Sequence, residues 1–392
     1  MARLMTSVKD ALQIINDKIS HLAPLEVGLL DALDLTLAEE ISSPIHMPPF
    51  DQSAMDGYAI CKHSEKEYRL IGEVKAGDQP QILLQPGEST RIFTGAMVPR
   101  GANSVVKQED VTRIDSSIII HCEPKAGMNI RPAGEQIKKS EIALSKGSRL
   151  NPGAIGFLAM LGITKVTVYR KPSISVIATG SELVKPGNEL TGGEIFESNT
   201  YTLQAALKKS GFSCEISSVE DDYAATKKSV RAALDKSDVV IVTGGISVGD
   251  YDFVGLVLGD LNVQTGFYKV KQKPGKPLFF GTAGSKLVFA LPGNPAAVLS
   301  CFYIYVLPAL KLLIGNQVEP KPIESIILAD SYSKSANLTH FLKARAENGK
   351  VKLLSSQSSA MLNSFVDSNC LAVMQEDKTE WKAGDLVDVI MI

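Results

Sequence analysis

Three short runs of almost wholly apolar residues in the middle of the chain constrain its fold most. They occupy residues 173–178, 238–242 and 287–291, and helical patterns at 198–210 and 222–236 separate the first two. Strands that are buried on both faces and joined through helices form parallel sheets with right-handed crossovers. The sequence therefore predicts an α/β domain built on a parallel sheet.

The flanking regions differ from this pattern and predict a multidomain α/β plus β protein. Short β-rich runs alternate with Gly/Pro turns between residues 45 and 137, whereas helical patterns occur near 6–19, 29–39 and 152–162. The resulting domains are a discontinuous, partly helical one of residues 1–44 and 138–170, an inserted β-rich one of 45–137, the α/β domain of 171–318 and a small C-terminal β domain of 319–392.

Composition excludes several classes of function. The net charge is −2 and aromatic residues make up 6%, which argues against a nucleic-acid-binding protein. The five cysteines are far apart without a C-x-x-C pair, so we expect a reducing compartment rather than disulfides or zinc. No signal-peptide core is evident, and the most apolar stretch, 296–310, is too short to span a membrane. We expect a buried helix there, no membrane span and a soluble, cytoplasmic protein.

Each of the three apolar runs ends in a turn that carries glycine. These turns cover residues 179–182, 243–250 and 291–295. The carboxyl ends of parallel strands share one edge of a sheet, so the turns should lie together, and a helix capped by Asn294 should point its positive end toward them. One such turn is equally compatible with an ordinary connection, but three favour a phosphate-bearing ligand. The candidate phosphate-binding residues are Gly244, Gly245, Ser247 and Gly249.

Lysines are concentrated between residues 261 and 318, where no acidic residue occurs. Lys269, Lys271 and Lys273 alternate along the chain and share one face if the segment is extended. Such a row is also typical of a solvated strand edge. Lys273 and Lys276, however, flank a Pro-Gly turn, and this stiff setting favours anion binding by these two.

Carboxylates are expected at the same edge of the sheet, where Asp221 and Asp222 follow a further predicted strand, 212–219. They are Glu182, Asp221, Asp222, Asp250 and Asp252. Carboxylates beside a phosphate site predict a hard divalent cation, most often Mg²⁺ held partly by the substrate. Alternatively, one aspartate of each pair caps the helix that follows it. No histidine lies in a triad or H-E-x-x-H motif, so the sequence does not support histidine-based nucleophilic catalysis.

A further loop lies outside the α/β region, at residues 51–59. It has the sequence D-Q-S-A-M-D-G-Y-A and follows the proline-rich segment 47–50. A dense set of polar groups next to a stiff segment favours a functional loop.

Seven segments in this order resemble the molybdopterin molybdenumtransferase family, which comprises the bacterial MoeA proteins and the E domain of gephyrin. They span almost the whole chain, and their combination is far more specific than any one of them. They are 51–59 (D-x-S-A-M-D-G-Y-A), 91–99 (R-I-x-T-G-A-x-V-P), 129–135 (N-I-R-x-x-G-E), 179–183, 244–252, 273–277 and 291–295.

The resemblance implies insertion of molybdenum from molybdate into adenylated molybdopterin, with release of AMP and assistance from Mg²⁺. It also implies a homodimer of elongated subunits that dimerise through the partly helical domain, and a C-terminal domain that is barrel-like. The active cleft would lie between the α/β domain of one subunit and the inserted domain of the other. Molybdopterin adenylyltransferase and molybdoenzyme-maturation proteins are candidate partners.

The family's functional residues map onto this sequence by their motifs. The implied catalytic residues are Asp56, Thr94, Glu182, Asp221, Asp252, Pro292 and Pro295, with Glu182, Asp221 and Asp252 as metal ligands and Lys269, Lys273 and Lys276 near the bound anion. Gln52 and Met97 depart from the usual pattern but remove no acidic residue.

Three other functions compete with this one. A molybdopterin adenylyltransferase resembles the α/β domain alone, and the 51–59 motif and the flanking domains argue against it. A gephyrin-like scaffold would carry a second α/β domain and a long disordered linker. A protein that binds a nucleotide sugar or a dinucleotide is disfavoured, because no predicted strand is followed by G-x-G-x-x-G.

Overall fold

The computed structural model describes residues 5–246, 253–316, 324–335 and 337–392. The chain forms two compact units, Glu26–Val168 and a second one made of Met1–Leu25 with Tyr169–Ile392. The predicted site residues Ser247, Gly249, Asp250 and Asp252 lie outside the described residues.

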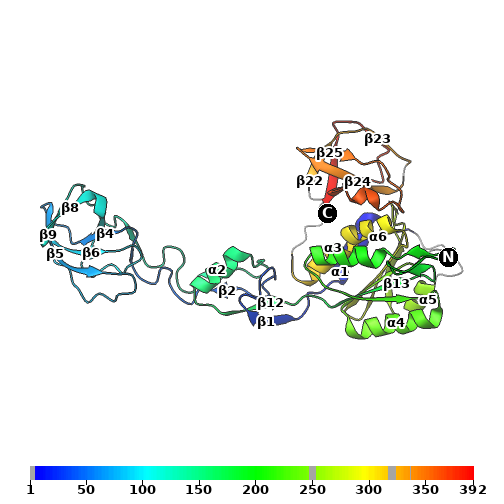
Figure 1. Ribbon diagram of the computed structural model, residues 1–392, viewed down its shortest axis with the longest axis horizontal. Coiled ribbons are helices and arrows are strands. Elements are labelled where there is room, and N and C mark those ends of the chain that lie inside the picture. The colour runs from blue at the N-terminus through cyan, green and yellow to red at the C-terminus, as the bar shows by residue number, and fades with distance from the viewer. Residues whose placement is uncertain (1–4, 247–252, 317–323, 336) are drawn as a thin grey trace. The chain divides into compact units, whose positions relative to one another are not determined.

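The β-rich part of the first unit is a six-stranded sheet with the order β7-β4-β6-β5-β9-β8 (Figure 1). Its strands are β4 (Gly57–Ile60), β5 (Glu67–Val74), β6 (Glu88–Ile92), β7 (Ser104–Lys107), β8 (Val111–Ile114) and β9 (Ser117–Ile120), and a 3₁₀ turn, η1, covers Gln108–Asp110. Alternate residues of β4 enter two different apolar clusters: Tyr58 and Ile60 the first, Ala59 the second. The sheet is therefore apolar on both faces.

The rest of this unit combines one helix with short strand pairs. The helix α2 (Pro152–Met160) begins as predicted, because the Asn151 side chain accepts a hydrogen bond of 2.9 Å from the Ala154 amide. The pairs are β1 (Pro24–Gly28) with β12 (Lys165–Tyr169), β2 (Ile41–Ser42) with β11 (Ile142–Leu144), and β3 (Gln52–Ser53) with β10 (Ile130–Arg131).

The prediction of a helix at residues 29–39 is wrong. This segment forms turns and isolated bridges. Its amides bond to distant carbonyls, from Asp34 to Leu150 at 2.8 Å and from Leu37 to Ser148 at 3.0 Å. Its apolar residues have helical spacing, but these tertiary hydrogen bonds and burial in the core outweigh that local preference.

The second unit contains the predicted parallel sheet, in the order β16-β13-β17-β21-β20-β18. Its strands are β13 (Ile174–Thr179), β16 (Glu215–Val219), β17 (Val239–Thr243), β18 (Gln264–Lys269), β20 (Pro277–Ala283) and β21 (Lys286–Leu291). The first four strands of that order are parallel, as predicted. The strands β18 and β20, which were not predicted, extend the sheet as antiparallel strands.

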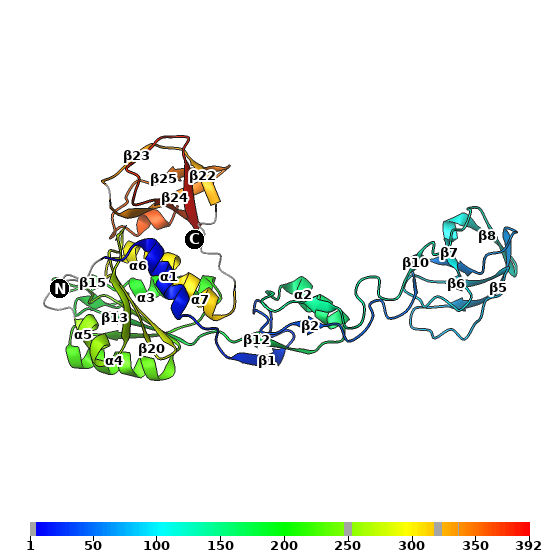
Figure 2. The same ribbon diagram turned by 180° about the vertical axis from the view of Figure 1, so that it is seen from behind.

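Helices cover both faces of this sheet (Figures 1 and 2). The α4 and α5 side chains form one apolar cluster with β13, β17 and β21, and α3, α6 and α7 lie on the other face. The helices are α1 (Val8–Lys18), α3 (Asn199–Lys209), α4 (Tyr223–Lys236), α5 (Phe253–Asp260), α6 (Pro295–Cys301), the π-helical η2 (Phe302–Val306) and α7 (Leu307–Leu313).

The continuous helical stretch Pro295–Leu313 is long and apolar enough to cross a membrane by length and composition. It is nevertheless a core helix, because 72% of its most apolar window is buried inside the protein. The expected buried helix at 296–310 is therefore confirmed.

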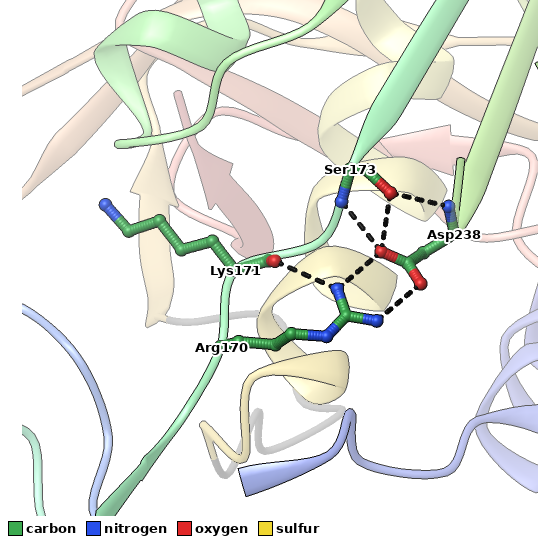
Figure 3. Close-up of polar contacts among 4 residues, drawn as sticks. All are labelled: Arg170, Lys171, Ser173 and Asp238. Atoms are coloured by element: carbon green, nitrogen blue, oxygen red, sulfur yellow. Dashed lines mark hydrogen bonds and ion pairs between the residues drawn. The ribbon is translucent and has the colours of Figure 1, made fainter. Parts of the chain in front are cut away.

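A charged cluster anchors the start of the α/β domain (Figure 3). The Arg170 guanidinium donates two hydrogen bonds of 2.7 Å to the Asp238 carboxylate, which also accepts from the Ser173 amide and hydroxyl at 2.8 Å. These contacts, led by Arg170, lower the pKa of Asp238 to about 2. They tie the segment before β13 to the segment before β17.

The C-terminal region is a small β-barrel, as predicted. Its sheet has the order β19-β24-β25-β22-β28-β26, and an additional pairing of β24 with β26 closes the last five strands into a ring. The six strands of the sheet are β19 (Gln272–Lys273), β22 (Glu324–Leu328), β24 (Thr339–Glu347), β25 (Lys350–Leu353), β26 (Cys370–Met374) and β28 (Leu386–Met391). The strand β19 comes from the α/β segment, so the barrel sheet continues into it.

Candidate active site

The turns after β13, β17 and β21 lie together, as predicted, and we call them the strand-end rim (residues 179–182, 243–246 and 291–294). A Cβ atom on Gly244 would lie 2.5 Å from the Thr179 carbonyl oxygen, and one on Gly293 would lie 3.9 Å from the Gly244 Cα atom. Gly244 has a φ of +92°, so only glycine fits this close approach without strain. The rim thus brings the backbones of two glycine turns side by side, and the Gly244 amide donates to the Leu291 carbonyl oxygen at 3.2 Å.

Asn199 ties two of these turns together, and the sequence analysis missed it. Its side-chain amide donates hydrogen bonds to the Thr243 hydroxyl (3.0 Å) and the Gly293 carbonyl oxygen (2.8 Å). The residue is only 9% exposed, and its Oδ1 atom has no hydrogen-bond partner among the described residues. A polar residue in the first turn of α3 could have been noticed, but from sequence it resembles an ordinary helix cap.

One predicted carboxylate, Glu182, lies on the strand-end rim, and another, Asp221, lies on the loop next to it. The Ser181 hydroxyl accepts a hydrogen bond of 3.0 Å from the Asp221 amide, which places Glu182 and Asp221 on adjoining loops. Asp222, rather than Asp221, caps α4 by accepting from the Ala225 amide at 2.7 Å. Asp221 is therefore not needed to begin the helix.

Carboxylate oxygens are the hard donors that Mg²⁺ prefers, so Glu182 and Asp221 fit such an ion chemically. Within the described ranges, however, no group of three or more His, Cys, Asp or Glu side chains is arranged to hold a metal. An ion held by these two residues needs further oxygen ligands, and substrate phosphate or water can supply them.

The lysine turn (residues 273–276) lies beside the first turns of α6. A Cβ atom on Gly275 would be 3.8 Å from the Ala297 carbonyl oxygen, and the Val270 amide donates to the Lys276 carbonyl oxygen at 3.0 Å. Lys273 and Lys276 are both exposed. Lys269 and Lys271 are half-buried, while Val270 and Gln272 between them are buried. Burial thus alternates along this segment, but the chain bends at Lys271, where the Gln272 amide donates to the Val270 carbonyl oxygen at 2.8 Å, so the three lysines do not lie on one continuous strand.

The amino-terminal end of α6 differs from the prediction. The Asn294 side chain does not cap the helix; it donates to the Ser359 hydroxyl at 3.0 Å. The Ser359 carbonyl oxygen accepts from the Ala296 and Ala297 amides at 3.0 and 3.3 Å. Because a loop of the barrel already satisfies these amides, this helix end does not offer them to an anion.

The loop that carries Ser359 is held by a buried lysine. The Lys343 ammonium donates to the carbonyl oxygens of Ser356 (2.7 Å), Ser358 (3.1 Å) and Met361 (3.0 Å). Burial lowers the pKa of Lys343. Three carbonyl acceptors offset the loss of hydration of this buried group.

In the unit Glu26–Val168, the structure brings together Asp56 and Thr94, which the family resemblance had singled out. One Asp56 carboxylate oxygen accepts from the Thr94 amide at 2.8 Å and from its hydroxyl at 2.7 Å. These two bonds, and then the charge of Arg91, lower the pKa of Asp56. Arg91 stacks on Tyr58 and Phe93 at 5.1 and 4.8 Å from the ring centres. Asp56 is thus an exposed, ionised carboxylate with a fixed orientation.

Comparison with known proteins accounts for nearly the whole chain. Residues 6–162 match the MoeA N-terminal region (domain I and II), residues 175–312 match a probable molybdopterin binding domain, and residues 325–392 match the MoeA C-terminal region (domain IV). A molybdopterin molybdenumtransferase of Haemophilus influenzae is 36% identical over 377 residues, which cover 93% of this chain and 92% of that protein. The chain belongs to the molybdopterin molybdenumtransferase (MoeA) family.

Other members of this family agree in sequence and in fold. A molybdopterin molybdenumtransferase of Staphylococcus aureus is 33% identical over 98% of this chain and 95% of its own length. The crystal structure of a molybdopterin biosynthesis MoeA protein from Pyrococcus horikoshii superposes with a TM-score of 0.86 at 30% identity, covering 99% of both chains. The expected fold, the enzyme class and the place in molybdenum cofactor biosynthesis are thereby confirmed.

Proposed function

We propose that this MoeA-family transferase inserts molybdenum from molybdate into adenylated molybdopterin and releases AMP. The meeting of Gly244 and Gly293 on the strand-end rim carries this proposal, because turns without side chains let phosphate oxygens approach the backbone closely. We assign Gly244 and Gly245 to this role, and Ser247 and Gly249 from the sequence. Pro292 and Pro295 border the third turn.

The carboxylates and the lysines have different roles in this proposal. Glu182, Asp221 and, from sequence, Asp252 hold the phosphoanhydride of the adenylated pterin together with Mg²⁺, which polarises it when bound. Lys269, Lys273 and Lys276 attract molybdate and neutralise its charge beside the pterin. No covalent protein intermediate is required.

We further propose that the protein is a homodimer, as the family resemblance implies. The unit Glu26–Val168 exposes large apolar side chains outside its inserted sheet, at Leu30 (83% exposed), Leu33, Ile142 and Met160. We propose that these side chains together form the association surface, because large apolar patches are typical of such surfaces. In the dimer, Asp56 and Thr94 of one subunit complete the active cleft of the other.

The remaining expectations are also proposals. They are the four domains of residues 1–44 with 138–170, 45–137, 171–318 and 319–392, the cytoplasmic location, and molybdopterin adenylyltransferase and molybdoenzyme-maturation proteins as partners. An adenylyltransferase is a chemically reasonable partner, because it supplies the adenylated pterin.

Release of AMP from adenylated molybdopterin tests the proposal. With molybdate and Mg²⁺ present, the purified protein should release AMP, and both omission of molybdate and addition of EDTA should stop the release. Full activity in EDTA would contradict the carboxylate–metal assignment. Failure to release AMP under all conditions would contradict the proposed reaction.

A further inference from the structure

A buried amide lies directly under the lysine turn. Gln272 is 1% exposed, and its Nε2 atom donates to the Gly275 carbonyl oxygen at 3.0 Å. The same nitrogen lies 3.6 Å from the Cys301 sulfur. The Oε1 atom of Gln272 accepts a hydrogen bond from the hydroxyl of Tyr305, which is fully buried. Both ends of this amide are therefore satisfied inside the protein.

The lysine turn is seated closely on the same helical stretch. A Cβ atom on Gly275 would be only 2.5 Å from the Cys301 sulfur, and Gly275 has a φ of +82°. Cys301 ends α6, and Tyr305 lies in the π-helical η2, one turn further along. On the other side of the lysine turn, Lys273 pairs with His340 of the barrel strand β24. The backbone of the turn is thus held from two directions.

Gln272 and Tyr305 are too deeply buried to contact a substrate. Their effect must instead pass through the turn that they hold, which presents two ammonium groups three residues apart. Like charges at this separation repel each other, and the repulsion favours opening of the turn. A hydrogen bond from the interior to the Gly275 carbonyl opposes that opening.

We propose that Gln272 and Tyr305 are positioning residues that keep Lys273 and Lys276 in one geometry for binding molybdate. This inference rests on the proposed role of the two lysines. A turn that is ordered before binding does not lose conformational freedom when the anion binds, so affinity for molybdate is higher than with a mobile turn. An apolar residue in place of Gln272 would leave the Gly275 carbonyl and the Tyr305 hydroxyl without partners.

Tyr305→Phe tests the proposal, because it removes only the hydroxyl that holds the Gln272 amide. The half-saturating molybdate concentration should rise about three- to tenfold, as expected for one lost neutral hydrogen bond, while kcat stays the same. Tyr303→Phe is the matched control, since Tyr303 lies in the same π-helical segment and is half-buried. It should change neither quantity.

Alkylation of Cys301 provides a readout that does not depend on activity. Its thiol is fully buried beneath Gly275, and burial raises its pKa to about 12. Loosening of the turn in Tyr305→Phe or Gln272→Leu should speed its labelling by N-ethylmaleimide, followed by peptide mass spectrometry. Cys370 is equally buried in the barrel and should label at the unchanged rate. Equal acceleration of both cysteines would indicate general destabilisation and overturn the proposal.

The same experiments separate this inference from the proposed function. If Lys273→Ala weakens molybdate use but Tyr305→Phe changes neither half-saturation nor Cys301 labelling, the positioning role is wrong and the proposed function stands. If Cys301 labels faster but the lysine substitutions leave molybdate use unchanged, the proposed molybdate site is wrong, and the positioning role for molybdate is overturned with it.

Discussion

Thr94 holds the Asp56 carboxylate through its amide at 2.8 Å and its hydroxyl at 2.7 Å. Such double donation fixes the direction of the carboxylate and favours its ionised form. The other Asp56 oxygen accepts no hydrogen bond from within the described chain. It is therefore the oxygen that we expect to face the substrate.

Thr94→Val removes the hydroxyl bond and keeps the amide bond. We expect the maximal rate of AMP release to fall about three- to tenfold, because the Asp56 carboxylate then loses one of the two hydrogen bonds that orient it. Thr94→Ser retains the hydroxyl and should restore most of the rate. Circular dichroism should be the same for both variants. Equal rates for Thr94→Val and the unchanged protein would contradict a role for this contact.

Substitutions in the lysine turn and at the rim carboxylates should change different kinetic constants. Lys273→Ala or Lys276→Ala should raise the half-saturating molybdate concentration roughly ten- to a hundredfold, since each removes a charge-assisted hydrogen bond worth about 1.5–3 kcal/mol. Glu182→Gln should instead lower the maximal rate, and additional molybdate should not restore it. Initial rates at varied molybdate measure both effects.

Lys208→Ala is the control for the lysine substitutions, because Lys208 is an exposed lysine in the last turn of α3. It should leave both kinetic constants unchanged. The assignment of the lysine turn to molybdate is wrong if Lys273→Ala and Lys276→Ala behave like this control.

At the scale of elements, the Arg170–Asp238 pair holds the start of β13 against the start of β17 (Figure 3). The pKa of Asp238 falls from 3.8 to about 2 on folding. A carboxyl whose pKa is lower in the folded state stabilises the fold above its unfolded pKa, and this stabilisation is lost as the pH falls through its folded pKa. The pair therefore stabilises the protein fully above about pH 5 and loses its effect between about pH 4 and pH 2.

Asp238→Asn should destabilise the protein by about 1–2 kcal/mol at pH 7. The pKa shift of Asp238 corresponds to about 2.4 kcal/mol of stability, and solvent screening of the partly exposed Arg170 reduces this contribution. Calorimetry of both proteins at pH 7 and pH 2.5 measures the difference. The unchanged protein and Asp238→Asn should be closer in stability at pH 2.5 than at pH 7. An equal difference in stability at both pH values would contradict an electrostatic origin of the effect.

Elements with a strong local pattern could be predicted from the sequence, and those fixed by distant contacts could not. The strand at 173–178 is apolar throughout and is β13 (Ile174–Thr179) in the structure. Residues 29–39 have helical spacing, but their amides bond to residues far along the chain. The hairpin of β18 and β20 was missed because its lysines and Gly/Pro turn masked the strand pattern.

Some features of the candidate site could likewise be predicted from the sequence, and others could not. The strand-end rim followed from topology, because parallel strands place their carboxyl ends at one edge. The contact between Asp56 and Thr94 spans 38 residues, and no local pattern predicts it; only the family motifs pointed to both residues. The Asn199 bonds and the Ser359 loop against α6 are tertiary contacts of single polar side chains, which periodicity does not reveal.

At the scale of the whole molecule, the proposed shared cleft predicts complementation between subunits. Asp56→Ala and Glu182→Ala homodimers should each be inactive, because each lacks one half of both clefts. Exchange of their subunits forms heterodimers with one intact cleft, so AMP release should recover to about half of the normal rate per heterodimer. Two Asp56→Ala preparations mixed in the same way are the control. No recovery in mixed dimers that are shown to form would contradict the shared cleft.

In the proposed reaction, metal insertion and AMP release are coupled. The most direct test of this coupling is to follow the molybdenum bound to the pterin and the AMP released in the same incubation of protein, adenylated molybdopterin, Mg²⁺ and molybdate. We expect both to rise together in equal amounts and neither to rise without molybdate. Release of AMP without molybdenum uptake, or molybdenum uptake while the adenylate remains intact, would contradict the coupling.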